Sequence, residues 1–200
     1  MAISLSLSDW YSRLLCWEPQ SYYGRWARCP YSLTVENDMP LLEFEHIIHI
    51  NDPREPQLPT MSRAQLWEGL LFRTKYPGHF NPTLSAELEN LSATGFIRHL
   101  RFGTAHLRDV VTLDHEHEIQ TRSEGLEGQM FARSLTRIEE PGAGHLLVRF
   151  YYCRDSGNVQ GGMDVDSYLK AAYLQNDREA VIMLRRFALE GLPGTGSWLQ

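Results

Sequence analysis

The run His145–Cys153, which reads HLLVRFYYC, decides the fold of this chain. One side of the run is apolar or aromatic and carries Leu146, Val148, Phe150 and Tyr152. The other side carries Leu147, Arg149 and Tyr151. Alternation with a period of two residues is typical of a β-strand whose two faces meet different surroundings. A sheet with one apolar face needs a cover, so another element must pack against this strand.

Further strand-like segments precede this run at short intervals. We predict strands over 44–51, 84–91, 96–102, 106–113, 118–123 and 130–139, which with 145–153 makes about seven. Glycine-rich and polar turn signals separate the last six of them. Loops of two to five residues join only neighbouring antiparallel strands, so these six strands predict an antiparallel meander.

Two helices are expected around the meander. Ser62 and Gln65 form a capping box for a helix over 63–76, because the serine caps the third amide and the glutamine reaches back. A second helix is predicted over 165–190, with N-cap oxygens in Asp164–Ser167 and Gly191 just past its end. Its length of roughly 37 Å suffices to lie across a curved sheet.

The order of strand, helix, six strands and long helix predicts an α+β fold of the helix-grip type. In this architecture a curved antiparallel sheet of about seven strands wraps around a long C-terminal helix, with a ligand cavity between them. We assign this domain to 39–192, an N-terminal extension to 1–38 and a tail to 193–200. Within the extension, the spacing of apolar residues over 7–15 favours one short helix, which would serve dimerisation or cover the domain. The alternative is that the extension is loosely packed.

Several blocks of this sequence resemble the AtaL-like family of the SRPBCC superfamily. The blocks are FEHIIHINDP, MSRAQLWEGLLFR, GFIRHLRFG, LRDVVTLD, RIEEPGAGHLLVRFYY and YLKAAYLQNDREAVIMLRRFALEG, within residues 43–191. The superfamily also holds START lipid-transfer domains, polyketide cyclases and the birch-pollen-type plant allergens. The resemblance implies a hydrophobic ligand cavity far more firmly than it implies a reaction.

Composition narrows the function classes. The net charge of −6 argues against a nucleic-acid partner, because no cationic field is available to displace counterions. The three cysteines are too scattered for a disulfide framework or a zinc ribbon, and they favour reduced thiols and a cytoplasmic location. No apolar run approaches the roughly 20 residues of a membrane span. No nucleotide-binding or covalent-catalysis motif occurs, so we expect no cofactor.

Arg98 and Asp109 are the candidate catalytic residues. Both fall on the apolar faces of their strands, and a buried charge needs a partner. With a turn over 103–106, Leu100 lies about opposite Asp109 and Arg98 is its diagonal neighbour. In a cavity the two charges could polarise a ligand carbonyl or shuttle a proton. The alternatives are a structural ion pair in the cavity wall, or a shifted register that leaves both charges in solvent.

Six further residues are candidates for binding the ligand. They are His46, Trp67, Phe96, Tyr152, Tyr168 and Tyr173. His46 and His49 face opposite sides of their strand, so one of them should point inward. The alternative for each of the six is a place in the core or the cavity wall without a role in chemistry.

The run Leu113–Glu118, which reads LDHEHE, is the strongest metal candidate by composition alone. It falls where the meander must reverse between two strands, whereas zinc is usually held by ligands that converge from a rigid scaffold. We therefore expect a charged turn that discourages edge pairing, and no metal.

Two function classes remain open for the domain. The first is an enzyme of secondary metabolism that cyclises, dehydrates or isomerises a hydrophobic polyketide-type or alkaloid-type intermediate by general acid–base catalysis. The second is a carrier or sensor that binds a hydrophobic small molecule without chemistry. A homodimer built on residues 1–38 is a third reading, which a mass measurement with and without that segment would test.

Overall fold

The computed structural model describes residues 41–124, 132–155 and 165–193. The predicted extension over 1–38, with its short helix, lies outside these residues. The predicted N-cap residue Asp164 and residues 194–200 of the tail also lie outside them.

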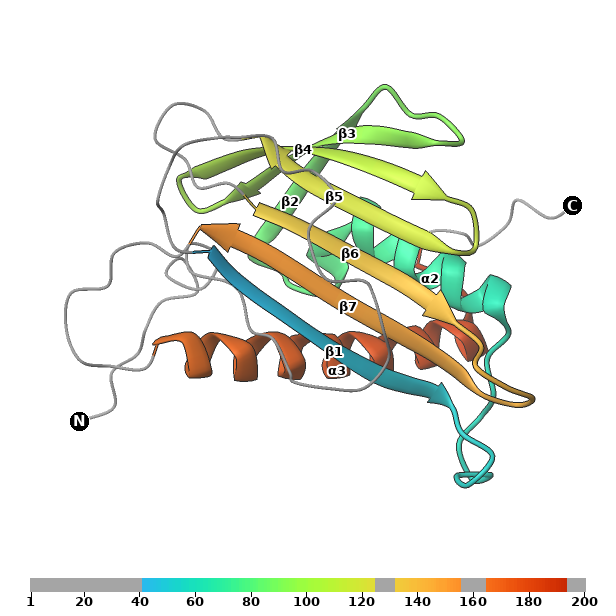
Figure 1. Cartoon of the computed structure of the whole chain (residues 1–200). Coiled ribbons are helices and arrows are strands. Elements are labelled where there is room, and N and C mark those ends of the chain that lie inside the picture. Colours follow the sequence, from blue (N-terminus) through green and yellow to red (C-terminus); the bar gives the residue numbers. More distant parts are fainter. Residues whose placement is uncertain (1–40, 125–131, 156–164, 194–200) are drawn as a thin grey trace, which may run out of the picture.

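The described residues form one seven-stranded antiparallel sheet. Its strands are β1 (Leu41–Asn51), β2 (Leu84–Glu89), β3 (Gly95–Phe102), β4 (Ala105–Asp114), β5 (Glu118–Glu124), β6 (Ala132–Glu139) and β7 (Leu146–Asp155). They lie in the order β1-β7-β6-β5-β4-β3-β2. Strands β2 to β7 are the predicted meander, and β1 completes the sheet beside β7 (Figure 1).

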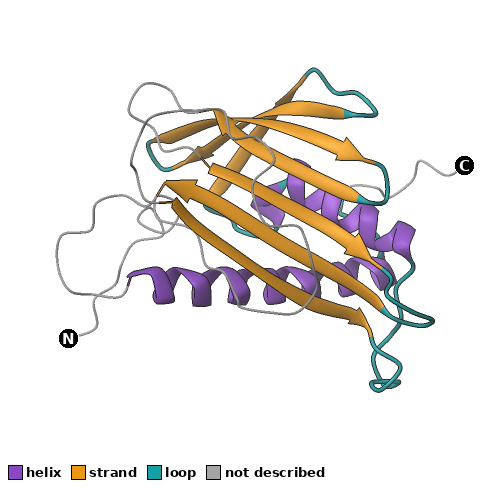
Figure 2. Ribbon diagram, viewed as in Figure 1, coloured by secondary structure: helices purple, strands orange, loops and turns teal. Residues whose placement is uncertain are grey.

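Two helices cover one face of this sheet. α2 (Arg63–Lys75) begins at the predicted capping box, in which the Ser62 hydroxyl accepts from Gln65 N and the Gln65 side chain accepts from Ser62 N. The short 3₁₀ helix η1 (Pro77–His79) follows it. α3 (Val165–Glu190) runs along the sheet, and its C-terminal part lies beside α2 (Figures 1 and 2). This layering confirms the predicted helix-grip fold.

Glycines mark the end of α3 and its contact with α2. The Gly191 N–H donates to the Phe187 carbonyl at 2.8 Å, and its φ of +91° is a conformation that side chains disfavour, as predicted for a C′ residue. At Gly69 a Cβ atom would lie 2.8 Å from Leu184 Cδ2. The two helices therefore approach closely because residue 69 has no side chain. Of the described helices, none has the length and apolar character that a membrane crossing demands.

The main core lies between the helices and the concave face of the sheet. Its most buried members include Leu66, Trp67, Phe96, Val111, Val148, Phe150 and Leu184. Val148 and Phe150 belong to the alternating run in β7, so the predicted inward face is confirmed. The opposite face of β7 places Arg149 within an ion-pair network with Glu139 and Glu45.

The run LDHEHE forms the turn between β4 and β5, as predicted. Asp114 ends β4 and Glu118 begins β5. Within the turn, His117 Nδ1 lies 2.7 Å from Asp114 Oδ2, on the surface. Arg63 Nη1 donates to the Glu116 carbonyl at 2.6 Å, which fastens the turn to the start of α2.

Candidate functional site

Arg98 and Asp109 lie directly opposite each other on β3 and β4. The predicted register, with Leu100 opposite Asp109, is wrong. Phe102 pairs with Ala105, so the turn contains only Gly103 and Thr104 instead of the four residues expected. Gly103 has a φ of +55°, which suits a tight two-residue turn. The shorter turn brings the two charges closer than a diagonal pairing would.

The side chains of Arg98 and Asp109 form a buried ion pair. Arg98 Nε and Nη2 donate to Asp109 Oδ2 at 2.9 and 2.6 Å, and the Ser123 hydroxyl donates to Oδ1 at 2.7 Å. Arg98 Nη1 donates to the Thr74 carbonyl at 2.8 Å, at the end of α2. Both carboxylate oxygens are therefore occupied, and Asp109 fixes the plane of the Arg98 guanidinium.

A second buried carboxylate, Asp177 on α3, is the centre of a larger cluster. Arg73 Nη2 donates to Asp177 Oδ1 at 2.6 Å, and the Tyr152 hydroxyl donates to Oδ2 at 2.6 Å. Burial raises the pKa of this carboxyl, but the Arg73 guanidinium, with smaller contributions from His46 and Tyr152, lowers the pKa below its ordinary value. Asp177 is thus held as a carboxylate in a fully buried place.

His46 is the fourth member of the Asp177 cluster. Its Nε2 lies 3.0 Å from Asp177 Oδ2, and only 9% of its side chain is exposed. The imidazole stacks against the rings of Phe150 and Tyr152, with centroid distances of 5.3 and 6.1 Å. Neither ring nitrogen makes a hydrogen bond of good geometry to the described residues. Buried polar atoms are nearly always hydrogen-bonded, so this imidazole has unused capacity next to a carboxylate.

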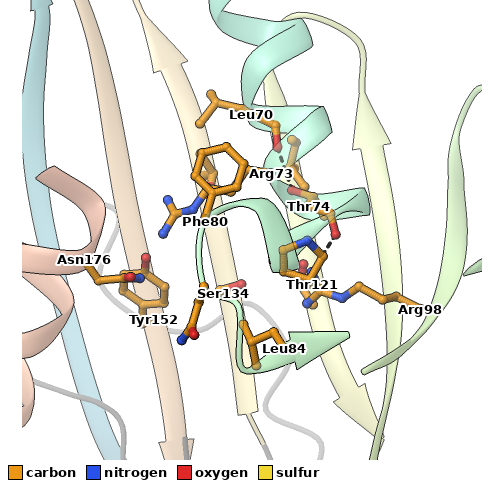
Figure 3. A pocket seen from close by; sticks show the side chains of 14 residues that line it. Leu70, Arg73, Thr74, Phe80, Leu84, Arg98, Thr121, Ser134, Tyr152 and Asn176 are labelled. Atoms are coloured by element: carbon orange, nitrogen blue, oxygen red, sulfur yellow. Dashed lines mark hydrogen bonds between the residues drawn. The ribbon is translucent and has the colours of Figure 1, made fainter. Parts of the chain in front are cut away.

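A pocket of about 130 Å³ opens between α2, α3 and the concave face of the sheet. It is lined by Leu70, Arg73, Thr74, Pro77, Phe80, Asn81, Leu84, Arg98, Ile119, Thr121, Ser134, Thr136, Tyr152 and Asn176. In Figure 3, Arg98 and Tyr152 lie on opposite sides of the pocket. The pocket is therefore lined by Arg98 from the Asp109 pair and by Arg73 and Tyr152 from the Asp177 cluster.

The other predicted ligand-binding residues have varied positions. Trp67 and Phe96 are buried in the main core and do not line the pocket. Tyr173 is buried and stacks on Tyr152 with a centroid distance of 4.5 Å, in a second layer behind the pocket. The prediction that Tyr168 faces the cavity is wrong, because its side chain is 57% exposed. The helix turns Leu169 inward instead.

Sequence reasoning missed Arg73 and Asp177. Asp177 lies four residues after the buried Tyr173 and seven before the buried Leu184, so it occupies the apolar stripe of α3. Arg73 follows the buried Leu70 by three residues on α2. A charged residue at a core position of a helix was therefore the available signal in both cases.

The chain matches one protein family along most of the described domain. Residues 48–191 match the AtaL family, described as "Acetylaranotin biosynthesis cluster protein L". The matched range agrees with the blocks that carried the resemblance in the sequence. No curated protein matches the chain.

Solved structures share the fold at low sequence identity. The aromatase/cyclase ZhuI from Streptomyces sp. R1128 has a TM-score of 0.54 and 13% identity, over 79% of this chain and 99% of that one. The di-domain ARO/CYC BexL from the BE-7585A biosynthetic pathway has a TM-score of 0.55 and 14% identity, over 76% of this chain. This chain spans about half of BexL, 51% of its length. Ara h 8.0201 has a TM-score of 0.50 and 12% identity, and the match covers 75% of this chain and 99% of that one.

Proposed function

The chain belongs to the AtaL family, and from this premise we propose that it is a biosynthetic enzyme that cyclises, dehydrates or isomerises a small organic molecule without a cofactor. One observation carries the proposal: the Arg98–Asp109 pair and the Asp177 cluster each present polar groups to a single pocket. Convergence of polar groups in a concave, partly apolar site is the usual arrangement of an active site. The fold shared with aromatase/cyclases agrees with this reaction class.

Arg73 and Arg98 are the proposed electrophilic groups. Each guanidinium lines the pocket and is held by a buried carboxylate behind it. A positioned guanidinium stabilises the negative charge that develops on a carbonyl oxygen when an enolate forms. Since the donors are already oriented, little reorganisation is needed during the reaction. Asp109 acts in this scheme as a positioning residue, because it does not line the pocket.

Tyr152, Asp177 and His46 are the proposed proton relay. Tyr152 lines the pocket, and its hydroxyl donates to Asp177 Oδ2, the same oxygen that His46 Nε2 approaches. The Tyr152 oxygen takes a proton from a substrate carbon while its own proton moves to Asp177. A rotation of the His46 ring, whose Nε2 lies 3.0 Å from Asp177 Oδ2, would bring Nε2 into line to take that proton. Return of the proton along the same path protonates a leaving hydroxyl, which then departs as water.

The proposed substrate presents oxygen atoms to the pocket and carbon to its wall. Arginine, threonine, serine and asparagine side chains supply hydrogen-bond donors, and the apolar wall comes from Leu70, Pro77, Phe80, Leu84 and Ile119. Pockets for drug-sized ligands measure roughly 300–1,000 Å³, which exceeds the 130 Å³ present. The pocket thus suits a compact molecule or one end of a longer hydrophobic one.

The test compares two hydroxyl deletions on one strand. Tyr152→Phe removes the proposed proton-transferring group and keeps the ring, whereas Tyr151→Phe removes a hydroxyl from the opposite face of β7. The native gene in its own host is replaced by each variant, and the metabolites are compared by liquid chromatography and mass spectrometry. We expect Tyr152→Phe to lower product formation about 10²- to 10⁴-fold and to accumulate a precursor that is an isomer of the product or heavier by one water. Tyr151→Phe should behave as wild type.

The proposed reaction is wrong if Tyr152→Phe protein, present at the wild-type level, leaves the metabolites unchanged.

A non-catalytic carrier or sensor is the second candidate function. It is favoured by one observation: among the described residues that line the pocket there is no acid and no histidine. Native mass spectrometry of protein purified from its host distinguishes the two. A carrier retains one unchanged molecule in wild type and Tyr152→Phe alike, whereas an enzyme retains different molecules in the two.

A further inference from the structure

Two histidines and an aspartate lie together at the end of the sheet where β1 meets β7. His49 is on the outward face of β1, and Asp52 follows the end of that strand. His145 precedes β7, whose residues Leu146 and Leu147 pair with Asn51 and His49. The antiparallel pairing of β1 with β7 thus brings three potential metal ligands from two distant segments to one place. None of the three lines the pocket.

The geometry of this group suits a metal ion. One ligand atom from each of the three residues lies within 4.8 Å of the others, and His49 Nδ1 is 3.7 Å from Asp52 Oδ2. Bonds of 2.0–2.2 Å to a tetrahedral zinc ion imply about 3.4 Å between ligand atoms. The distances between ligand atoms therefore exceed the ideal value by at most about 1.4 Å. His49 is half exposed, so a side-chain rotation closes that gap without a change in the backbone.

The Asp52 carboxylate already forms an ion pair with Arg54. Arg54 Nε lies 3.0 and 3.1 Å from the two carboxylate oxygens, Nη2 donates to Oδ2 at 2.6 Å, and the Arg54 backbone N–H donates to Oδ1 at 2.9 Å. The hydrogen bonds from Arg54 hold the pKa of Asp52 well below its usual range, so the group stays a carboxylate. The Arg54 side chain itself is 79% exposed, and exposed ion pairs contribute little stability.

We propose that His49, Asp52 and His145 bind a divalent first-row transition metal such as Zn²⁺, with the Arg54 side chain swinging away to solvent. Two imidazoles and one carboxylate are typical ligands of Zn²⁺ and of its neighbours in the series. The guanidinium occupies the carboxylate in the metal-free protein. Water completes the coordination, because the site opens to solvent on the side of His49.

The bound metal would tie together two connecting segments of the domain. Asp52 begins the loop from β1 to α2, and His145 ends the turn from β6 to β7. Arg185 joins this loop to the preceding strand, because its Nη1 donates to the Pro59 carbonyl in the loop at 2.9 Å and its Nη2 donates to the Ile50 carbonyl in β1. Because the loop leads directly into α2, the metal would limit the motion of the helix that carries Arg73.

The test is a calorimetric titration of the full-length, chelator-treated protein with Zn²⁺ alone. We expect the His49→Ala and His145→Ala variants to bind at least about tenfold more weakly than wild type at this site, and the double variant to lose one equivalent of Zn²⁺. Arg54→Ala should bind more tightly than wild type, because it removes the competing cation. The matched control is His117→Ala, which removes a surface histidine 2.7 Å from Asp114 and should change nothing.

Titration with Co²⁺ gives an independent readout, since its visible absorption reports imidazole coordination. The bands should appear with wild type and with Arg54→Ala, and should weaken in both histidine variants. Circular dichroism confirms that each variant is folded, which the exposure of His49 favours. The proposal is overturned if the double variant binds as many equivalents of Zn²⁺ as wild type with the same affinity. It is also overturned if Arg54→Ala binds more weakly than wild type.

Discussion

Asp109 and Asp177 are two buried aspartates that are partnered in contrasting ways. Each accepts hydrogen bonds from one arginine and one hydroxyl, and each arginine lines the pocket. The partners of Asp109 lie on β3 and β5, the strands on either side of β4. The partners of Asp177 come from α2, β1 and β7.

The two ion pairs differ in the sequence separation of their partners. Arg98 and Asp109 are 11 residues apart and meet through a single tight turn. Arg73 and Asp177 are 104 residues apart, and they meet only when both helices have docked on the sheet. The first pair is therefore a property of a hairpin, whereas the second is a property of the complete fold.

The largest effect is expected for Asp177→Ala. This change leaves the Arg73 guanidinium without its buried counter-ion and removes the acceptor of the Tyr152 hydroxyl. Breaking a buried ion pair by deleting one partner costs about 3–5 kcal/mol of unfolding free energy. Urea unfolding followed by circular dichroism measures this loss. A loss below about 1 kcal/mol would show that the cluster is not a structural centre of the fold.

Asp109→Ala should have a smaller effect, about 2–3 kcal/mol. The Arg98 side chain keeps its hydrogen bond to the Thr74 carbonyl. Loss of Asp109 affects Arg98 and Ser123, whereas loss of Asp177 affects Arg73, Tyr152 and the neighbouring His46. The same urea measurement ranks the two variants. If Asp109→Ala proves the more destabilising, then the hairpin pair is the more important of the two clusters, and the contrast drawn between them reverses.

A finer comparison removes the one hydroxyl that donates to each carboxylate, from Tyr152 for Asp177 and from Ser123 for Asp109. Tyr152→Phe should lower the unfolding free energy by about 1.5–3 kcal/mol, since its hydroxyl bonds a charged group that is fully buried. Ser123→Ala should cost less, about 1 kcal/mol, because Ser123 lies at the penultimate position of β5, where water can replace its small hydroxyl on Asp109 Oδ1. Equal losses in the two unfolding curves would contradict the proposed difference in surroundings.

The smallest effect is expected in the pH dependence of stability. The pKa of Asp177 is lower in the folded protein than in the unfolded chain, so its contribution is fully present above the unfolded pKa of about 4. That contribution is lost as the pH falls toward the folded pKa. One proton of difference corresponds to a slope of at most about 1.4 kcal/mol per pH unit. Asp177→Asn should reduce the slope of unfolding free energy below pH 4, and an unchanged slope would refute the assignment.

The elements of this fold were accessible from sequence because their signals are local. Alternation in β7, the capping box at Ser62 and the left-handed glycine at 191 each depend on a few neighbouring residues. The predicted strands agree with the structure to within a few residues at each end. The register of β3 and β4 was predicted wrongly because it depends on the length of one turn, and the four polar and small residues over 103–106 permit more than one.

The candidate site was only partly accessible from sequence for a related reason. Alternation put Arg98 and Asp109 on the inner face, and the parity of β1 put His46 and His49 on opposite faces, which the structure confirms. Tyr168 was placed wrongly because an apolar residue near the edge of a helical stripe points inward or outward after a small rotation. Asp177 was missed because an acid within such a stripe is usually read as a break in it.

The sequence by itself determined the class of fold, the inward face of most strands and one of the two carboxylate pairs. These follow from periodicities of two and about four residues and from short turns, which the chain encodes locally. Only the tertiary structure decided that Arg73, Tyr152, Asp177 and His46 form one cluster, and that His49, Asp52 and His145 meet at one edge. Such groups form only when segments far apart in the sequence dock together, and the physical reason is that side-chain contacts depend on distance in space, which local periodicity does not specify.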